Sequence, residues 1–271
     1  MQNTPKSIFK NLYPYGFLIL LLIFLVSIRG KTKQLLIYSP PYAHNDTLYY
    51  PHLDSSDHVI HHSYYDLVYS ETHEQAKWVF HKLYPYRISR SFERKNDFRS
   101  DPMVLSGSAN HIDYRGSGYD RGHLMPAADM SWSKQGMSES FYYSNMSPQH
   151  PSFNRGVWKR LESRIRKWAI EYDSLYVFTG PVLEADLPSI GINQVSIPNW
   201  YYKVVLRFDK GKETAIGFLM KNKASKESLQ TFANSIDDIE RMIEIDFFSA
   251  LPENQEKILE RNSDVLEWSW D

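Results

Sequence analysis

The segment from Asn154 to about Tyr172 constrains the fold of this chain more than any other part of the sequence. Its apolar residues recur at helical spacing and form one stripe, made of Trp158, Leu161, Ile165, Trp168 and Ala169. A helix with such a stripe must bury it against a second layer of structure. Strand-like runs that end at turn residues follow it, at about 175–179, 202–208 and 215–220. Strands and helices in this irregular order predict an α+β domain rather than a doubly wound parallel sheet.

The remaining segments of the domain have weaker patterns. Residues 62–69 are rich in Tyr and Val and are expected to form a strand, and Thr72 is then expected to cap a helix over 73–83. Residues 87–102 are polar and charged, which is typical of a loop. Two short helices are predicted at 225–233 and 237–243.

The first 29 residues are predicted to lie outside the fold. Lys6 and Lys10 precede a dense apolar run from Phe17 to Val26, which is typical of an export signal. No clean small-residue cleavage site follows, so an uncleaved signal anchor is favoured over a cleaved signal peptide. In both cases we expect the globular domain outside the cytoplasm, anchored to a membrane in the first and secreted or periplasmic in the second.

A change of composition marks the next boundary. Residues 30–57 are rich in Pro, Tyr, Asn, Asp, Ser and His, so we interpret them as a linker to a globular domain at 58–271.

The chain of 271 residues has 31 Lys and Arg against 32 Asp and Glu, which argues against a histone-like nucleic-acid binder. It has no cysteine, which excludes disulfides, a thiolate zinc site and a cysteine nucleophile.

A glycine-rich segment carries the first chemical motif, Gly116-Ser117-Gly118-Tyr119-Asp120-Arg121-Gly122-His123. The glycines permit tight turns and the close approach of a ligand. His123 can accept a proton near neutral pH, and Arg121 can contact a phosphate through two nitrogen atoms. An ordinary surface loop, with a salt-bridged Asp120–Arg121 pair and a solvated histidine, would explain the same residues.

The second motif is Ser144-Asn145-Met146-Ser147-Pro148-Gln149, followed by the start of the long helix. Asn145, Asn154 and Glu162 bear oxygen atoms that suit a hard cation. Glu162 lies about 80° around a helix from Asn154, so the two are expected on neighbouring faces. Magnesium fits such a sparse site because it keeps several water ligands. The alternative is that Asn154 only caps the helix and that Glu162 is a solvated residue paired with a basic neighbour.

Together these blocks resemble the family of non-specific DNA/RNA endonucleases that includes endonuclease G. The resemblance rests on Tyr119-Asp120-Arg121-Gly122-His123-Leu124, on Asn145-Met146-Ser147-Pro148-Gln149, and on Asn154 and Glu162, in this order and at this spacing. The stretch from His62 to Trp78 is also similar to the start of the domain in bacterial members, and the similarity covers roughly residues 59–251. It implies a ββα-metal fold, also called a His-Me finger, with a central antiparallel sheet flanked by helices.

The resemblance implies a role for each motif residue. His123 is the expected general base, and Asn154 is the expected direct ligand of a hydrated Mg2+ ion, for which Mn2+ or another divalent cation can substitute. Glu162 is expected to orient metal-bound water, and Asn145 to orient the base or the phosphate region. Arg121 and Gln149 match positions that support the site in the family. Arg94 resembles the arginine that family members place upstream of the motif to face the transition state, but this match is looser because Arg90 and Arg99 lie close by. Arg155 is a further candidate for substrate contact.

The implied activity is a magnesium-dependent hydrolysis of phosphodiester bonds in both DNA and RNA. His123 would take a proton from the attacking water, and Arg94 or Arg121 would face the charge on the phosphoryl oxygens. The expected partners are DNA and RNA substrates and a membrane through the N-terminal segment; a homodimer is considered as well, but the sequence reveals no interface for it. The sequence identifies no inhibitor protein.

Two other classes of function compete with this prediction. One is a binding module that has lost catalysis, and the intact His123, Asn154 and Glu162 count against it. The other is a phosphoesterase for small phosphodiesters at the membrane, and the basic face of the long helix favours a polyanion instead.

The other conspicuous residues have structural explanations. The histidines are expected in core and helix positions rather than at a metal; they are His61, His62, His73 and His81. The tyrosine pairs at 142–143 and 201–202 are expected to pack in the interior rather than to stack on bases. The acidic stretch from Asp237 to Asp271 is expected to be a solvated face rather than a cation site.

Overall fold

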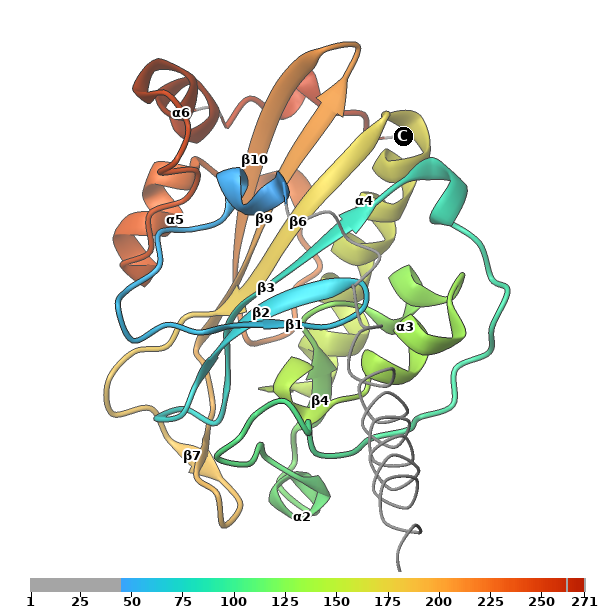
Figure 1. The fold of residues 1–271 in the computed structure, drawn as a ribbon, viewed down its shortest axis with the longest axis vertical. Helices are drawn as coiled ribbons and strands as arrows, with labels where there is room; N and C mark the ends of the chain where they lie inside the picture. The colour runs from blue at the N-terminus through green and yellow to red at the C-terminus, as the bar shows by residue number, and fades with distance from the viewer. Residues whose placement is uncertain (1–44, 262, 271) are drawn as a thin grey trace, which may run out of the picture. The chain divides into compact units, whose positions relative to one another are not determined.

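A computed structural model describes residues 45–261 and 263–270 of the chain. Its centre is a sheet of seven strands, and each pair of neighbouring strands is antiparallel (Figure 1). In spatial order the strands are β1 (Val59–His61), β2 (Tyr65–Ser70), β3 (Gln75–Leu83), β6 (Ser174–Pro181), β9 (Trp200–Asp209), β10 (Lys212–Lys221) and β11 (Ala233–Asn234). The predicted α+β class with a central antiparallel sheet is confirmed.

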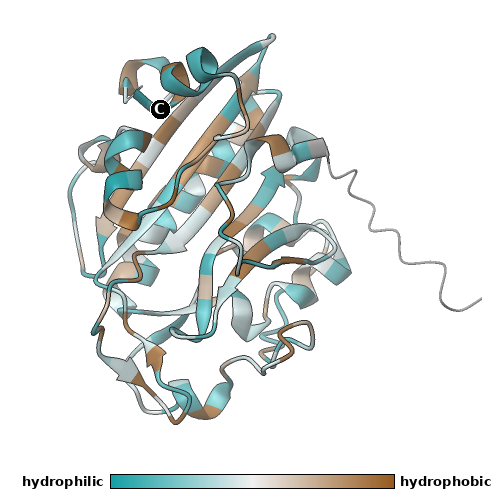
Figure 2. Cartoon of the chain, turned by 60° about the vertical axis from the view of Figure 1, so that its left-hand side comes forward, coloured by the Kyte–Doolittle hydropathy of each residue, from teal (hydrophilic) through white to brown (hydrophobic). Residues whose placement is uncertain are grey.

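Helices cover both faces of this sheet, and each face has its own apolar core. On one face lies α4 (Lys159–Glu171), and its buried stripe shares a core with Val205 of β9. On the other face lie α5 (Ile236–Ile243) and α6 (Glu253–Arg261), which share a second core with Val204 of the same strand. Successive side chains of a strand point to opposite faces, so a central strand is apolar on both. Figure 2 shows hydrophobic residues along the strands of the sheet.

Shorter elements connect these layers. Two small ladders lie outside the main sheet, one between β4 (Asp120–His123) and β5 (Met146–Gln149) and one between β7 (Ser189–Ile190) and β8 (Val195–Ser196). The short α-helices are α2 (His111–Tyr114) and α3 (Lys134–Glu139). Single turns of 3-10 helix are η1 (Asn45–Tyr49), η2 (Pro85–Arg87), η3 (Ala127–Met130), η4 (Tyr143–Asn145), η6 (Leu229–Phe232) and η7 (Val265–Glu267).

The helix predicted over residues 73–83 is wrong, because this segment is strand β3. It pairs with β2 on one side and with β6 on the other, so it lies inside the sheet. Ala76, Phe80 and Leu83 have helical spacing, but they lie in a strand whose two faces are both buried. When both faces of a strand are buried, the alternation that would reveal a strand is lost.

Other local predictions are confirmed in part. The segment 62–69 is a turn after β1 followed by most of β2, and 225–233 contains only the turn η6 before β11 begins. The helix predicted at 237–243 is α5, and the strands predicted at 175–179, 202–208 and 215–220 lie within β6, β9 and β10.

The amino-terminal predictions fall mostly outside the described residues. This holds for the signal segment at 1–29 and for the linker up to residue 44. Residues 45–57, also predicted as linker, belong to the folded domain: Tyr50 is buried and donates its hydroxyl to Asp66, and Asp46 pairs with Lys82. Turn-forming composition is common to linkers and to loops that pack on a domain, which explains this error. Of the helices within the described ranges, none has the length and apolar character needed to cross a membrane.

Candidate active site

The two sequence motifs meet in one β-β-α unit. β4 pairs antiparallel with β5, so that His123 lies opposite Met146 and Asp120 lies opposite Gln149. The chain then turns at residues 150–152 and enters the helical segment that leads into α4. A strand that ends at the candidate base is thus followed by a helix that bears the candidate metal ligands, as the sequence predicted.

Packing between the two strands explains why the third glycine of the first motif, Gly122, is a glycine. A Cβ atom at Gly122 would lie 2.2 Å from Cδ of Gln149, so only glycine lets this side chain lie across β4. Gln149 is fully buried, and its amide has no hydrogen-bond partner in the described part of the chain. The side chain of Gln149, which the resemblance offers as a substrate-binding candidate, fills the interior between the strands and does not line the cleft.

Asn145 is also buried, and it binds the backbone. Its Nδ2 donates to the carbonyl oxygens of Met125 and Ser140 at 2.9 and 2.8 Å, and its Oδ1 accepts from the Met125 N–H at 2.8 Å. The Leu124 N–H donates to the Asn145 carbonyl at 3.0 Å. These bonds fix the chain directly after His123, so Asn145 acts on the candidate base through the backbone and does not line the cleft.

The regular part of the long helix begins later than predicted. Residues Phe153–Trp158 (η5) form an irregular π-type segment in which Gly156 has φ −106° and ψ −110°, and α4 follows from Lys159. Distortions of this type occur frequently at functional sites. The rotation expected for a straight helix therefore does not apply to Asn154 and Glu162, although both side chains line the same cleft.

This cleft has a volume of about 630 Å³ and gathers six of the eight predicted site residues, namely Arg94, Arg121, His123, Asn154, Arg155 and Glu162. Further ionisable side chains line it, namely Asp120 from the first motif together with His111, Arg115, Lys159 and Arg166. Arginine and lysine side chains thus outnumber the two carboxylates of Asp120 and Glu162. Such a cleft concentrates anions even though the whole chain is nearly neutral.

His123 is held in its neutral form. Its ring is 8% exposed and packs edge-on against Phe141, with 4.9 Å between the ring centroids. Burial lowers the pKa of His123 to about 3, and the charge of Arg94 adds to this decrease, while a hydrogen bond to the backbone of Arg121 opposes it. Nε2 has no hydrogen-bond partner among the described residues, so the backbone bond belongs to Nδ1. Nε2 is therefore the nitrogen atom that can accept a proton.

Asp120 orients the two side chains at the start of the helical segment. Nδ2 of Asn154 donates to Asp120 at 2.8 Å, and Arg155 donates to both carboxylate oxygens, at 2.8 Å from Nε and 2.5 Å from Nη2. Burial would raise the pKa of Asp120, but the hydrogen bonds from Arg155 and Asn154 outweigh it and lower the pKa. Because its nitrogen atom is engaged, Oδ1 is the atom of Asn154 that is left to serve as a ligand, and the side chain does not serve as a helix cap.

Glu162 interacts with a group of buried charged side chains. Burial raises the pKa of Glu162, and the cations Lys203 and Arg166 oppose this increase. Lys203 of β9 is buried and donates to Thr179 Oγ1 at 2.6 Å, while Arg166 pairs with Asp129 at 2.8 Å. The carboxylates of Glu162 and Asp129 are thus balanced by cations from the sheet and from α4.

The arginines of the cleft stack on two phenylalanines that the sequence did not single out. Cζ of Arg121 lies 4.1 Å from the ring centroid of Phe98, and Cζ of Arg94 lies 5.0 Å from that of Phe141. Phe98 also packs edge-on against Phe141 and His123. Stacking fixes the plane of a guanidinium group and leaves its N–H groups available for phosphate.

The structure distinguishes among the three upstream arginines. Arg94 lines the cleft, and Arg90 and Arg99 do not. Arg99 instead donates to the Asp97 carboxylate and to the Ser138 carbonyl, both at 2.9 Å. Burial lowers the pKa of Arg94, and the nearby Glu162 opposes this decrease, so the two side chains interact across the cleft.

The histidines outside the motif do not form a metal site within the described residues. Each has a separate partner: His61 bonds Asp66, His62 bonds Asp101, His73 bonds Ser196 and His81 bonds Asp129. The interior packing predicted for the tyrosine pairs is confirmed for Tyr143, Tyr201 and Tyr202, which are fully buried.

The oxygen atoms of the cleft fit a hydrated magnesium ion. Oδ1 of Asn154 is a neutral oxygen donor, and Glu162 supplies a carboxylate in the same cleft. Magnesium is usually bound through one or two protein ligands, with water and substrate phosphate in its other positions. The cleft provides no second unpaired carboxylate, because Asp120 is engaged by Arg155.

Comparisons with known proteins identify a matching family and several relatives of this chain. Residues 44–254 match the family described as DNA/RNA non-specific endonuclease. Mitochondrial endonuclease G of Homo sapiens is 37% identical over 192 residues, which cover 65% of this chain and 65% of that protein. The mitochondrial nuclease EXOG of Danio rerio is 34% identical over 206 residues, which cover 70% of this chain and 60% of that protein. The chain thus spans less than two thirds of either relative.

A solved structure shares the fold over most of its length. It is the crystal structure of the EndoG/EndoGI complex, which describes the mechanism of EndoG inhibition. The matched chain is 31% identical to this one with a TM-score of 0.72, and the match covers 79% of this chain and 95% of that chain.

Proposed function

The chain belongs to the DNA/RNA non-specific endonuclease family, and from this premise we propose that it hydrolyses phosphodiester bonds of DNA and RNA with a bound magnesium ion. The observation that carries the proposal is the composition of the cleft. A neutral histidine, an oriented amide oxygen and an excess of arginine and lysine line one space of about 630 Å³.

His123 is the group that would activate the attacking water. The Arg121 backbone holds the tautomer in which Nε2 accepts the proton. A pKa of about 3 makes the free site a weak base, and Arg94 contributes to this low value. A bound phosphate would offset the charges of Arg94 and Arg121, so the substrate itself would raise the pKa of His123 toward the range of an effective base.

Arg94 and Arg121 would bind the scissile phosphate. Their guanidinium groups are fixed on Phe141 and Phe98, and both line the cleft with His123. In phosphodiester hydrolysis negative charge grows on the phosphoryl oxygens in the transition state. Donors that are already oriented stabilise this charge without further reorganisation.

Asn154 would hold the metal ion directly, and Glu162 would hold it through water. When bound, the ion supplies Lewis-acid stabilisation of the phosphate and of the leaving oxygen. Asp120 contributes by engaging Nδ2 of Asn154, which directs Oδ1 outward as the ligand atom. A neutral amide ligand also leaves the charge of the ion undiminished.

The proposed substrate range follows from the lining of the cleft. Contacts with phosphate and sugar carry no sequence information directly. The charged lining consists mainly of arginine and lysine, which suits contacts with the phosphodiester backbone. We therefore expect weak sequence preference and the cleavage of both DNA and RNA.

One experiment tests the proposal. The full chain is incubated with plasmid DNA and with RNA, in magnesium or in chelator, beside the variants His123→Ala and Asn154→Ala. We expect degradation of both nucleic acids in magnesium, no degradation in chelator, and strong loss in both variants. The variant His111→Ala removes another imidazole from the same cleft and should keep most of the activity. Intact nucleic acid under every condition would contradict the proposal.

Cellular location and assembly are separate proposals. The basic and apolar pattern of residues 1–29 supports an exported or membrane-anchored protein. Cell fractionation, together with sequencing of the mature amino terminus, distinguishes an anchor from a cleaved signal. The predicted homodimer is tested by sedimentation equilibrium of the purified chain, and a monomer at all concentrations would contradict it.

A further inference from the structure

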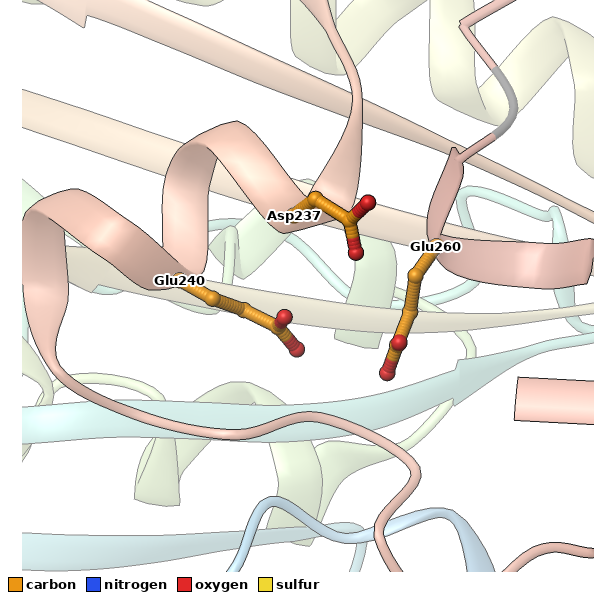
Figure 3. Close-up of side chains that lie close together, drawn as sticks. All are labelled: Asp237, Glu240 and Glu260. Carbon is orange, nitrogen blue, oxygen red and sulfur yellow. The ribbon is translucent and has the colours of Figure 1, made fainter. Parts of the chain in front are cut away.

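Five carboxylates form a cluster on the sheet face opposite α4. Asp237 and Glu240 come from α5, Asp246 from the loop that follows, and Glu256 and Glu260 from α6. Single oxygen atoms of Asp237, Glu240 and Glu260 lie within 4.8 Å of one another, and the same holds for Asp246, Glu256 and Glu260. Figure 3 shows the side chains of the first group converging on one space. Glu260 belongs to both groups and is therefore central.

Glu260 is buried without a partner for one of its oxygen atoms. The residue is 7% exposed, and Oε1 is buried with no hydrogen bond to any described residue. Its neighbour Leu259 packs into the core beneath α6, so the helix cannot rotate to expose Glu260 without breaking that packing. A buried carboxylate oxygen without a partner is costly, and such an atom calls for a ligand. The prediction of a solvated acidic face is therefore wrong for this residue.

Within the described residues no ion pair joins a basic side chain to the cluster, although the charge of Lys257 acts on Glu256 without pairing with it. The nearby basic residues pair elsewhere, Arg241 with Asp238 and Lys257 with Glu253. Burial, reinforced by the neighbouring carboxylates, raises the pKa of Glu260 to about 8 and that of Glu240 to about 7. One internal bond, from the Phe247 N–H to Glu240 at 2.6 Å, fixes the loop after α5. The cluster is thus a preformed concentration of negative charge.

We infer that this carboxylate cluster binds a calcium ion, at a second site that is separate from the cleft. Its side-chain ligands are oxygen atoms only, which selects a hard cation, and three to five carboxylates exceed what magnesium usually takes. Calcium binds six to eight oxygen atoms at about 2.3–2.6 Å, so two ligands of one ion lie up to roughly 5 Å apart. The spacing within 4.8 Å meets this condition. The family match ends at residue 254, so Glu256 and Glu260 lie beyond it.

The bound ion would fasten α5 to α6 and both to the sheet. The two helices and their connecting loop contribute Ile239, Phe247, Phe248 and Leu259 to the core of this face. An ion that bridges ligands from both helices opposes their separation. Its effect is therefore on the stability of the carboxyl-terminal part, and it supplies no group to the cleft.

The test uses the full chain with Asn154→Ala, which removes the proposed metal ligand of the cleft. Calcium binding is measured by titration calorimetry, and thermal unfolding is followed with calcium and with chelator. We expect one ion per chain, and a rise in Tm of roughly 5–10 °C when calcium exceeds its Kd a hundredfold. Adding Glu260→Gln should abolish both effects. The matched control Glu253→Gln, on the same helix but outside the cluster, should leave both unchanged.

A measurement in chelator excludes simple unfolding as the cause. Glu260→Gln removes one charge from a repulsive cluster, so at alkaline pH without calcium this variant should melt no lower than its parent. The inference is overturned if millimolar calcium neither binds to the Asn154→Ala chain nor raises its Tm. It is also overturned if Glu260→Gln retains the same stoichiometry and the same shift in Tm.

Discussion

Buried carboxylates occur on both faces of the central sheet, but they are balanced in different ways. On the α4 face, Asp129 and Glu162 interact with the cations Arg166 and Lys203. On the opposite face, the charges that act on Glu260 are all carboxylates. The first group is neutralised by the chain itself and is a permanent part of the fold. The second requires a proton or a cation from solution, so its state depends on the medium.

The same comparison explains the small net charge of the chain. The cleft is lined mainly by arginine and lysine, and the α5–α6 face gathers five carboxylates. A net charge of −1 is the sum of these two regions rather than a property of either. The local fields are therefore of opposite sign, one suited to a polyanion and the other to a cation.

The largest expected effect comes from removing the neutral imidazole of the α4 face. His123→Ala should lower kcat for plasmid cleavage roughly 10²–10⁴-fold, because a general base contributes about this much. Its Tm should not fall comparably, since Nε2 of His123 has no hydrogen-bond partner among the described residues that the change would leave unpaired. The control His111→Ala should cost little. A loss of less than about tenfold in His123→Ala would remove the base from the proposed mechanism.

The balance on the α4 face is broken by Lys203→Met. This change removes one of the two cations that balance Glu162 and Asp129 and leaves only Arg166, so we expect a loss of about 3–5 kcal/mol in the free energy of unfolding, measured with urea. The control Lys212→Met removes an exposed pair with Glu267, which should cost at most about 1 kcal/mol. Adding Glu162→Gln to Lys203→Met should recover part of the loss. Equal effects of the two lysine changes would contradict an internal balance.

The opposite face is tested by pH in the absence of divalent cations. The folded-state pKa values of Glu240 and Glu260 are raised from 4.5 to about 7 and about 8. Their stabilising contribution is therefore fully present below pH 4.5 and is lost as pH rises through 7 and 8. Between the two ends of this range we expect a loss on the order of 1–3 kcal/mol in the free energy of unfolding.

Glu260→Gln should flatten this alkaline decline, and calcium should abolish it in the parent chain. His123 acts in another window, because its pKa is lowered from 6.5 to about 3 and stability falls as pH drops below 6.5. The two effects overlap between pH 4.5 and 6.5, but they have opposite slopes, so one series of urea titrations that extends beyond both limits distinguishes them. An alkaline decline that is identical in the parent and in Glu260→Gln would show that the cluster does not titrate as a unit.

Much of the site could be predicted from the sequence because its determinants are local. The stripe of α4 is confirmed in the core, and the blocks around His123 and Asn154 form consecutive elements of one unit. The segment β3 was predicted wrongly because burial on both faces removes the alternation of a strand. Lys203 could have been identified from the sequence as part of the site: a single lysine within an apolar strand must be buried with partners.

The acidic cluster could not be derived from the sequence. Asp237 and Glu260 are far apart along the chain, and each alone is typical of a solvated helix residue. Only the packing of α5 beside α6 brings their oxygen atoms within 4.8 Å. The same holds for Phe98, whose role depends on contacts with Arg121 and His123 that the segment 87–102 does not reveal.

The smallest predicted effect comes from a change at Gly122, the residue that precedes the proposed base His123 in β4. In Gly122→Ala the new Cβ would lie 2.2 Å from Cδ of Gln149, so the buried glutamine must move. Overpacking of this kind costs about 1–3 kcal/mol, and it should also lower kcat because His123 is the next residue of β4. The double variant Gly122→Ala/Gln149→Ala creates the missing space and should regain most of the stability, measured by urea unfolding, and part of kcat. The glutamine amide makes no hydrogen bond to the described residues, so its removal forfeits only packing. If the double variant is no more stable than Gly122→Ala, the glycine is required for a reason other than contact with Gln149.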